Sequence, residues 1–475
     1  MSSAEVKKDA IFAIARNLAR IRYEDLPQSA VSMTKTDILD TLAVSLAAGT
    51  MAPVCGKMIN LVTKIGGCAD STIVGDGRKV PAHLAAMANA ALAHALNYDD
   101  YLDPLITHFG CVIFPAAFAM AERVGRVSGK ELVTAYTLGL DVTGRLSRTL
   151  ITTGEKRDWQ VYGWLTTQLF GYLGAAAVAG RLQGLDEDGL INALGLAYSQ
   201  LGGNKQPLIG VDADKGIYPS YPAHSGVLAA MMAAEGIAGP KESLEGQAGL
   251  YKVFFQGVYE PATLTRDLGK TFEGVGFHIY PCCSFTHTRI ELAMKMVDEH
   301  KFRPDDIESV TVYAGPMSRF LCEPLEVRRN PRLMAEAQYS LPFTVATALV
   351  KGKPRIEHFT PEGLRDPRIL AVSNKVGYVF DAVYDLKHGS GECPAKIEIK
   401  LKDGRLLTGE QRGVRYGHPD RPLTRDDFRE KFRECAAYAP HHIAPATIEK
   451  VIGMIENLEE IDDVGEIVTM VSRTG

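Results

Sequence analysis

The feature that most limits the fold of this chain is the spacing of its apolar residues, which recur every three or four positions up to about residue 265. That spacing is typical of helices, and a clear example is the run Ile38, Leu39, Leu42, Ala43, Leu46 and Ala47. Residues 171–180 and 226–236 are rich in small side chains, which would let helix backbones approach one another closely. The pattern predicts an all-α core whose helices are buried on most sides.

The pattern changes between residues 277 and 414, where short strand candidates appear among short helices. Residues 396–401 alternate strictly between polar and apolar side chains, and Lys402-Asp403-Gly404-Arg405 then has the composition of a hairpin turn. Two further candidate strands occupy residues 309–313 and 376–380. We therefore expect a smaller α+β domain in this part of the chain.

Helical spacing returns after Gly417-His418-Pro419, with Thr424 as a candidate N-cap and Asp426 and Asp427 in the first turn. A chain of 475 residues exceeds what one hydrophobic core usually serves. The sequence predicts a mainly α protein with an α+β insert. The expected parts are residues 1–270 (helical domain, first part), 271–416 (α+β domain) and 417–475 (helical return).

The composition excludes several classes of partner. A net charge of -5 and a pI near 6.2 leave no basic surface for nucleic acid or for an anionic membrane. The N-terminus resembles no secretion signal, and the alanine-rich run at residues 82–95 is too short to span a bilayer. The eight cysteines form no C-x-x-C pair. We expect a cytoplasmic protein with reduced thiols that binds neither nucleic acid nor membrane.

Two segments go beyond a generic helical pattern. The first reads HALNYDD at residues 94–100 and is followed by Thr107-His108; the second reads YPCCSFTH at residues 280–287. Both resemble signature stretches of the MmgE/PrpD family, whose members include 2-methylcitrate dehydratase, cis-aconitate decarboxylase and iminodisuccinate epimerase. The resemblance extends, in the expected order, through residues 171–182, 215–230 and 336–345.

The resemblance implies a large helical domain formed by both chain ends, a smaller α+β lid domain between them, and an active site in the cleft. Family members act on small carboxylic acids, are typically homodimers, and need no metal or organic cofactor. Moving a proton on a carbon beside a carboxylate requires an acid or base near that carbon and cations that hold the carboxylate. We expect a cofactor-independent lyase, a dehydratase or a decarboxylase, because lyases are the commoner outcome in the family.

Three residues are the candidates for catalysis. His108 matches the family histidine that follows the D-Y-D-D segment, and its neutral form can act near pH 7. Lys215 matches a family lysine that contacts the substrate carboxylate. His278 stands where the family usually has a lysine, and it still offers a hydrogen bond or a proton. The structural alternatives are a packed histidine at a helix start, a solvated loop lysine and an exposed interdomain histidine.

Six further residues are expected to line the substrate site: Asn97, Asp100, Tyr101, Leu165, Tyr280 and His287. Asn97 replaces the first aspartate of D-Y-D-D, and Leu165 replaces a family histidine, so two groups that transfer protons or bind anions are lost. Asp103 is a candidate for the role of the missing aspartate. We hypothesise a substrate with fewer carboxylates or a more apolar body, contacted by Tyr101, Trp159, Tyr162 and Trp164.

Other interpretations stay open at this point. Residues 99–103 spell D-D-x-x-D, the magnesium motif of isoprenoid synthases, with residues 426–430 as a candidate partner. The replaced residues also fit a catalytically degenerate binding protein. An epimerase or isomerase would begin at the same kind of acidic carbon as a lyase. Cys282 and Cys283 resemble nucleophiles, but packing is favoured because adjacent residues of an extended chain point in opposite directions.

Overall fold

The computed structural model describes residues 8–102, 107–151, 163–209, 215–270, 272, 275–387 and 391–473. The chain divides into two compact units. Unit 1 contains Met1–Ala95, Asp99–Val275 and Phe428–Gly475, and unit 2 contains Leu96–Tyr98 and Gly276–Asp427. Both chain ends therefore belong to unit 1, and the main boundaries lie C-terminal to those expected at 270/271 and 416/417. The predicted fold class, mainly α with an α+β insert, is confirmed.

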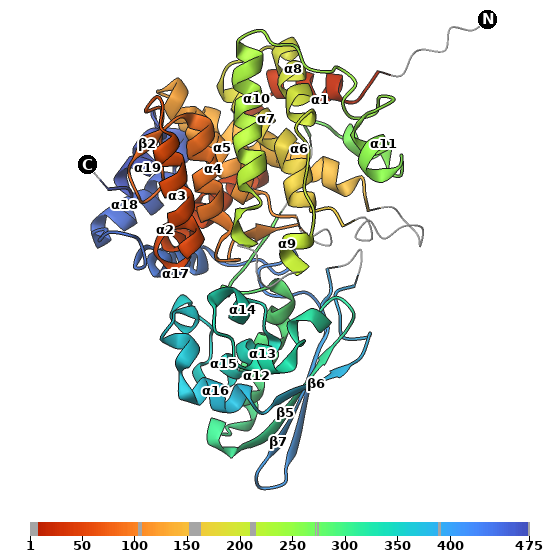
Figure 1. Ribbon diagram of the computed structural model, residues 1–475, viewed down its shortest axis with the longest axis vertical. Helices are drawn as coiled ribbons and strands as arrows, with labels where there is room; N and C mark the ends of the chain where they lie inside the picture. The colour runs from red at the N-terminus through yellow and green to blue at the C-terminus, as the bar shows by residue number, and fades with distance from the viewer. Residues whose placement is uncertain are drawn as a thin grey trace, which may run out of the picture. The chain divides into compact units, whose positions relative to one another are not determined.

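Unit 1 consists of helices and very short strands (Figure 1). Its α-helices are α1 (Ile11–Arg20), α2 (Gln28–Met51), α3 (Pro53–Ile65), α4 (Ala82–His94), α5 (Gly110–Val124), α6 (Gly129–Arg148), α7 (Thr166–Leu182), α8 (Glu187–Tyr198), α9 (Gln206–Ile209), α10 (Ser220–Ala234), α11 (Leu250–Phe255), α18 (Pro445–Glu456) and α19 (Gly465–Met470). Its strands are β1 (Ser71–Thr72), β2 (Lys79–Val80) and β3 (Asp100–Tyr101). The 3-10 turn η3 (Lys215–Ile217) precedes α10.

Helix α7 is the centre of unit 1, because it packs against α5, α6, α8 and α10. Glycines permit the close approach. A Cβ on Gly174 of α7 would lie 2.9 Å from Ile113 of α5, and one on Gly226 of α10 would lie 2.7 Å from the nitrogen of Ala176. These separations are shorter than ordinary van der Waals contact, so only glycine fits. The predicted close packing of residues 171–180 and 226–236 is confirmed.

Helix α2 is buried along most of its length and includes two buried carboxylates, Asp37 and Asp40. The C-terminal helix α18 packs against α2, and α19 packs against α5. Figure 1 shows these C-terminal helices in blue beside the red and orange helices of the N-terminal part. Within the described residues, no single helix has the length and apolar character to cross a membrane; α2 and α3 meet that test only jointly, across a bend of 93°.

Unit 2 contains a four-stranded sheet in the order β6-β5-β7-β8. The strands are β5 (Ile307–Ala314), β6 (Val376–Phe380), β7 (Ala395–Leu401) and β8 (Leu406–Gln411), and only the β5–β6 pair is parallel. The apolar residues of β7 are buried, and α12 (Ser284–His300) packs on β7 and β8. All the strands predicted from alternation are confirmed, and so is the hairpin between β7 and β8.

The remaining elements of unit 2 are short. They are β4 (Gly276–Phe277), α13 (Leu325–Arg329), α14 (Met334–Gln338), α15 (Leu341–Lys351) and α16 (Pro367–Ser373). Helix α17 (Arg425–Ala436) begins in unit 2 and ends in unit 1. The amide of Asp427 donates to the hydroxyl of Thr424, and the carboxylate of Asp427 accepts from the amide of Thr424 at 2.8 Å. The predicted N-cap at Thr424 is confirmed.

Candidate active site

The candidate site in unit 1 is built around a carboxylate shared by two histidines. His94 is the last residue of α4, and its Nδ1 lies 2.8 Å from Oδ2 of Asp99. His108 lies just before α5, and its Nδ1 lies 3.2 Å from the same oxygen. The two imidazole rings meet edge to face, with centroids 4.7 Å apart. We call His94, Asp99 and His108 the histidine–aspartate cluster; all three residues are buried.

Asp100 fixes the backbone on which His108 stands. Its carboxylate accepts hydrogen bonds from the amides of Phe109 and Gly110, each at 2.9 Å, at the start of α5, where backbone donors have no helical partner. Its backbone carbonyl lies 2.6 Å from Nδ1 of His108. The amide of His108 donates to the hydroxyl of Thr167 at the start of α7. The structure thus places the carboxylate of Asp100, predicted to bind substrate, as a helix cap.

The charges within the cluster differ strongly. Burial would raise the pKa of Asp99, but His94 and His108 outweigh it and hold that pKa well below its usual range. Burial would lower the pKa of His108, yet the adjacent carboxylate of Asp99 raises it overall. Burial lowers the pKa of His94. The shifts favour the anion of Asp99, that anion favours the protonated ring of His108, and burial favours the neutral ring of His94.

Further acidic residues lie around the cluster, and two of them, Asp37 and Asp40 of α2, were not predicted as site residues from the sequence. Burial and the charge of Asp99 raise the pKa of Asp100 to about 7, and burial and Asp100 raise the pKa of Asp37 well above its usual range. Tyr136 donates to Asp37 at 2.7 Å, and Lys431 of α17 pairs with Asp40 at 2.6 Å. The sequence does contain a signal for these residues, because Asp37 and Asp40 interrupt an otherwise apolar helical run.

A second group of predicted residues lies in unit 2, in the segment that leads into α12. The ring centroid of His287 lies 5.1 Å from that of His278 and 4.9 Å from that of Tyr280. Nε2 of His287 lies 3.1 Å from the carbonyl oxygen of Cys282. We call His278, Tyr280 and His287 the histidine–tyrosine cluster. Three of the predicted residues are therefore brought together, and all are buried.

Asn97 lies on the short segment Leu96–Tyr98, which belongs to unit 2. Its φ is 48°, in the left-handed region that asparagine tolerates better than most residues. The flanking residues are anchored, because Tyr98 donates to the carbonyl of Ile279 at 3.3 Å and Gln338 donates to that of Leu96 at 2.5 Å. The left-handed backbone at position 97 is thus a structural reason for an asparagine at this position.

The other predicted residues have different surroundings. Leu165 is buried immediately before α7, and Tyr101 is buried in β3. The indole nitrogen of Trp164 donates to the carbonyl of Phe254 at 3.0 Å. Cys282 and Cys283 are buried, and burial raises the pKa of the Cys282 thiol, which suits packing rather than nucleophilic attack. Asp103, Trp159, Tyr162 and the side chain of Lys215 lie outside the described part of the structure.

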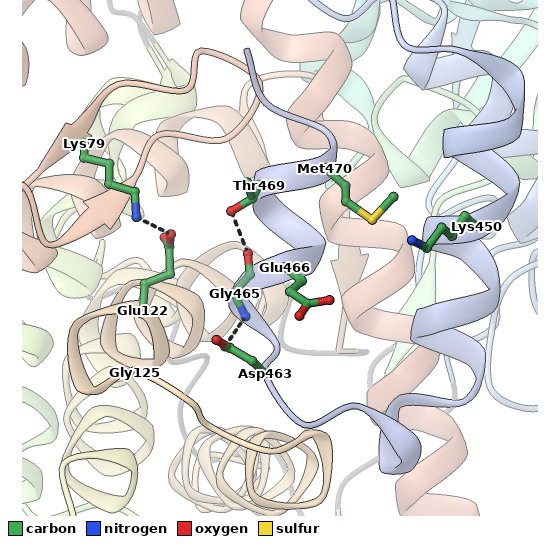
Figure 2. Close-up of a pocket in the computed structure, with 9 residues that line it drawn as sticks. All are labelled: Lys79, Glu122, Gly125, Lys450, Asp463, Gly465, Glu466, Thr469 and Met470. Atoms are coloured by element: carbon green, nitrogen blue, oxygen red, sulfur yellow. Dashed lines mark hydrogen bonds and ion pairs between the residues drawn. The ribbon is translucent and has the colours of Figure 1, made fainter. Parts of the chain in front are cut away.

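A pocket of about 400 Å³ opens elsewhere in unit 1, beside α18 and α19 (Figure 2). Its lining includes Lys79, Glu122 and Asp463, but none of the residues of the histidine–aspartate cluster. Lys79 pairs with Glu122 at 3.4 Å, and Asp463 accepts from the amide of Gly465. This pocket has the features of a polar surface hollow. We therefore keep the histidine–aspartate cluster as the candidate active site.

Models of two protein-family domains match almost the whole chain. The MmgE/PrpD N-terminal domain matches residues 13–261, and the MmgE/PrpD C-terminal domain matches residues 280–460. The chain belongs to the MmgE/PrpD family. The expected family membership is therefore confirmed, and the two matched regions correspond to a helical part and a part that contains the sheet.

Several curated relatives align over nearly their full length. Cis-aconitate decarboxylase-like protein oryM of Aspergillus oryzae is 25% identical, over 96% of this chain and 95% of the relative. Cis-aconitate decarboxylase of Homo sapiens is 26% identical, over 95% of this chain and 92% of the relative. Cis-aconitate decarboxylase of Aspergillus terreus is 24% identical, over 95% of this chain and 94% of the relative.

Membership of the MmgE/PrpD family also decides how the D-D-x-x-D motif is interpreted. Asp99 contacts two histidines, Asp100 caps α5, and Asp427 caps α17, so these three described carboxylates have structural partners. Two groups come close enough to share an ion, His94 with Asp99 and Cys111, and Asp99 with Asp100 and His108. However, burial and Asp99 raise the pKa of the Cys111 thiol well above its usual range, which opposes the thiolate that a metal requires. In the second group, the carboxylate of Asp100 already accepts the amides of Phe109 and Gly110. The family match, rather than the geometry of the carboxylates, counts against the isoprenoid synthase interpretation.

Proposed function

We propose that this protein is a lyase that acts on a small carboxylic acid, with His108 as the residue that transfers the proton. The relatives named cis-aconitate decarboxylase support the reaction class. The observation that carries the assignment is the position of His108 at the start of α5, next to the Asp99 carboxylate. That carboxylate favours the protonated ring, and a protonated ring is the form that can give a proton to carbon.

We also infer which nitrogen of His108 exchanges the proton. Nδ1 of His108 faces both the carbonyl of Asp100 at 2.6 Å and the carboxylate of Asp99 at 3.2 Å. A nitrogen held by two oxygens keeps its proton and fixes the ring orientation. Proton exchange with substrate is therefore assigned to Nε2.

Among lyase reactions, we favour decarboxylation. The bond between the carboxyl group and its carbon breaks, carbon dioxide leaves, and the electron pair stays on carbon until the His108 cation protonates it. A dehydratase would instead need a base that removes a proton from carbon, and the raised pKa of His108 disfavours that role. In this proposal Lys215 neutralises the remaining carboxylate of the substrate, and no metal or organic cofactor takes part.

The replaced residues bear on the choice of substrate. Leu165, buried beside the first turn of α7, can bind no anion, and Asn97 carries no charge. His278 offers a less permanent cation than lysine. We propose that the substrate has fewer carboxylates, or a more apolar body, than the tricarboxylate named in the relatives. Stronger binding of tricarboxylates than of monocarboxylates would contradict this part of the proposal.

Proton NMR in heavy water tests the reaction class. The purified protein is treated with a chelator and mixed with mono-, di- and tricarboxylic acids. Conversion to a decarboxylated product with one deuterium on the former carboxyl-bearing carbon is the expected result. Conversion to an alkene with loss of water would identify a dehydratase.

Three other outcomes would contradict the proposal. Deuterium at a retained α or β carbon without loss of substrate would identify an epimerase or isomerase. No change with any acid, together with equal binding by His108→Gln and the wild type, would identify a binding protein. Restoration of activity only after a divalent metal is added would contradict cofactor independence.

A further inference from the structure

Asp99 is the residue on which the two buried histidines of unit 1 converge. Its Oδ2 is 2.8 Å from Nδ1 of His94 and 3.2 Å from Nδ1 of His108. The side chain of Asp99 is fully buried, so water does not screen either interaction. One oxygen thus links the end of α4 to the residue that precedes α5.

We propose that Asp99 is a positioning residue that orients the His108 ring and stabilises its protonated form, and that His94 holds Asp99 in place. The inference rests on the proposed role of His108 in proton transfer. It adds two residues, Asp99 and His94, whose effect on the reaction passes through His108 rather than through contact with substrate.

The geometry gives Asp99 and His94 different tasks. His108 already has a neutral partner at Nδ1, the carbonyl of Asp100 at 2.6 Å, which orients the ring. The carboxylate of Asp99 adds the charge that a backbone carbonyl lacks. His94 contacts Asp99 through Nδ1, and its ring lies edge to face against His108 and against Tyr218, each with centroids 4.7 Å apart. A ring confined in this way restricts the carboxylate it contacts.

Other ionisable groups around the cluster do not replace Asp99. Asp100 is the second acidic neighbour of His108, but its carboxylate accepts two backbone amides and its pKa is raised to about 7 by burial and by Asp99. From α2, Asp37 faces Asp100 and has a raised pKa, and Asp40 is paired with Lys431 of α17. From α5, burial raises the pKa of the Cys111 thiol. From α6, burial raises the pKa of Tyr136. Asp99 is the group among these whose pKa is lowered.

The direct test is an NMR titration of His108 in protein whose histidines carry ¹³C at Cε1. The chain has 12 histidines, and the His108→Gln variant identifies the signal that belongs to His108. We expect Asp99→Asn to lower the pKa of His108 by about one unit or more, because the variant removes an opposite charge within contact distance. A second set of samples, with ¹⁵N in the histidine rings, reports which ring nitrogen carries the proton.

Variants at His94 test whether its contact with the carboxylate of Asp99, rather than the packing of its ring, affects His108. His94→Asn keeps a donor close to the place of Nδ1, whereas His94→Leu removes it. We expect His94→Leu to lower the pKa of His108 and His94→Asn to restore part of the difference. His83→Gln is the matched control, because His83 is also on α4 but pairs with the ring of His224 instead. It should leave the titration of His108 unchanged.

A folded Asp99→Asn protein in which His108 titrates as in the wild type would overturn the inference. If Asp99→Asn does not fold, the comparison of His94→Leu with His94→Asn decides, and equal His108 titrations in that pair would overturn it as well. The titration needs no substrate. A lowered pKa in a protein that converts no acid would uphold the positioning role while the proposed lyase function fails.

Discussion

Among the described residues, each unit contains one pair of buried histidines whose rings are in contact, but the two pairs are held by different chemistry. In the histidine–aspartate cluster of unit 1, a buried carboxylate contacts Nδ1 of both rings. In the histidine–tyrosine cluster of unit 2, the contacts of His287 include a backbone carbonyl and the rings of His278 and Tyr280. A carboxylate stabilises a cation, whereas a carbonyl fixes the ring orientation and the tautomer.

The difference assigns distinct tasks to the two clusters. The histidine–aspartate cluster is suited to store and deliver a proton, and the histidine–tyrosine cluster is suited to present oriented hydrogen-bond groups. Burial raises the pKa of the Tyr280 hydroxyl, so this group stays a neutral donor across the ordinary pH range. We propose that the histidine–aspartate cluster supplies the acid, and the substrate-binding role of Tyr280 and His287 stays a prediction.

The largest expected effect separates the two clusters directly. His108→Gln should reduce turnover by a factor of about 10² to 10⁴, the usual contribution of a general acid. His287→Gln should have a smaller effect on turnover and a larger one on the Michaelis constant, because it alters hydrogen-bond geometry. Steady-state kinetics with the acid found by NMR gives both parameters. A greater loss of turnover in His287→Gln than in His108→Gln would reverse the assignment.

The second prediction concerns the buried ion pair between Asp40 of α2 and Lys431 of α17. Lys431→Met leaves the buried carboxylate of Asp40 without its partner at 2.6 Å and should destabilise the protein by about 3–5 kcal/mol. Arg433→Met is the matched control on the same helix, because Arg433 and Glu449 form an exposed pair that should contribute less than about 1 kcal/mol. Urea unfolding measures both, and equal losses would contradict a buried pair.

The third prediction compares the packing of the two units. Gly226→Ala should destabilise unit 1 by about 1–3 kcal/mol, because the new Cβ would lie 2.7 Å from the nitrogen of Ala176. Gly377→Ala in β6 of unit 2 should cost little, since its nearest neighbour would lie 4.0 Å away. Thermal unfolding of the two variants checks the pair. Similar losses in both would mean that backbone freedom, rather than close contact, sets the cost of losing a glycine.

Much of the fold follows from periodicity, because the spacing of apolar residues reports local geometry. Residues 396–401 alternate strictly, and their strand and its hairpin were predicted correctly. The cap at Thr424 could be predicted because a helix cap, like a periodic pattern, depends on residues that are close in the sequence. Long-range pairing carries no such local signal. Lys431 and Asp40 are far apart in the chain, so their contact could not be inferred from the pattern.

The sequence motif identified candidate site residues, but it did not identify the partners that their side chains have in the folded chain. The motif around His108 indicated a proton-transfer residue, but the role of Asp100 as a cap depends on where the loop returns to α5. His94 and Asp99 were read as parts of a motif, and their shared contact with His108 appears only when α4 and α5 are placed together. Side-chain partners depend on tertiary packing that a single sequence does not encode locally.

A pH-dependent effect contrasts two aspartate caps, Asp100 in unit 1 and Asp366 in unit 2. Burial raises the pKa of Asp100 to about 7, above the ordinary value of about 3.9, so the folded state keeps a proton that the unfolded state releases between these values. Stability from this residue therefore falls as the pH rises from about 4 to about 7. Hydrogen bonds from Lys351 and from helix α16 lower the pKa of Asp366, so its contribution is present above the unfolded value and is lost as the pH falls.

Asparagine substitutions should therefore respond to pH in opposite ways. The melting temperature of Asp100→Asn, relative to the wild type, should rise between pH 5 and pH 8, because the variant carries no charge to bury. Asp366→Asn should be destabilised by about 1 kcal/mol or less at pH 7, and the loss should shrink toward pH 4. Calorimetric scans at several pH values test both. If the difference in melting temperature between Asp100→Asn and the wild type stays constant with pH, the wild-type carboxylate of Asp100 is ionised throughout this range. His108 would then have two anionic neighbours, Asp99 and Asp100.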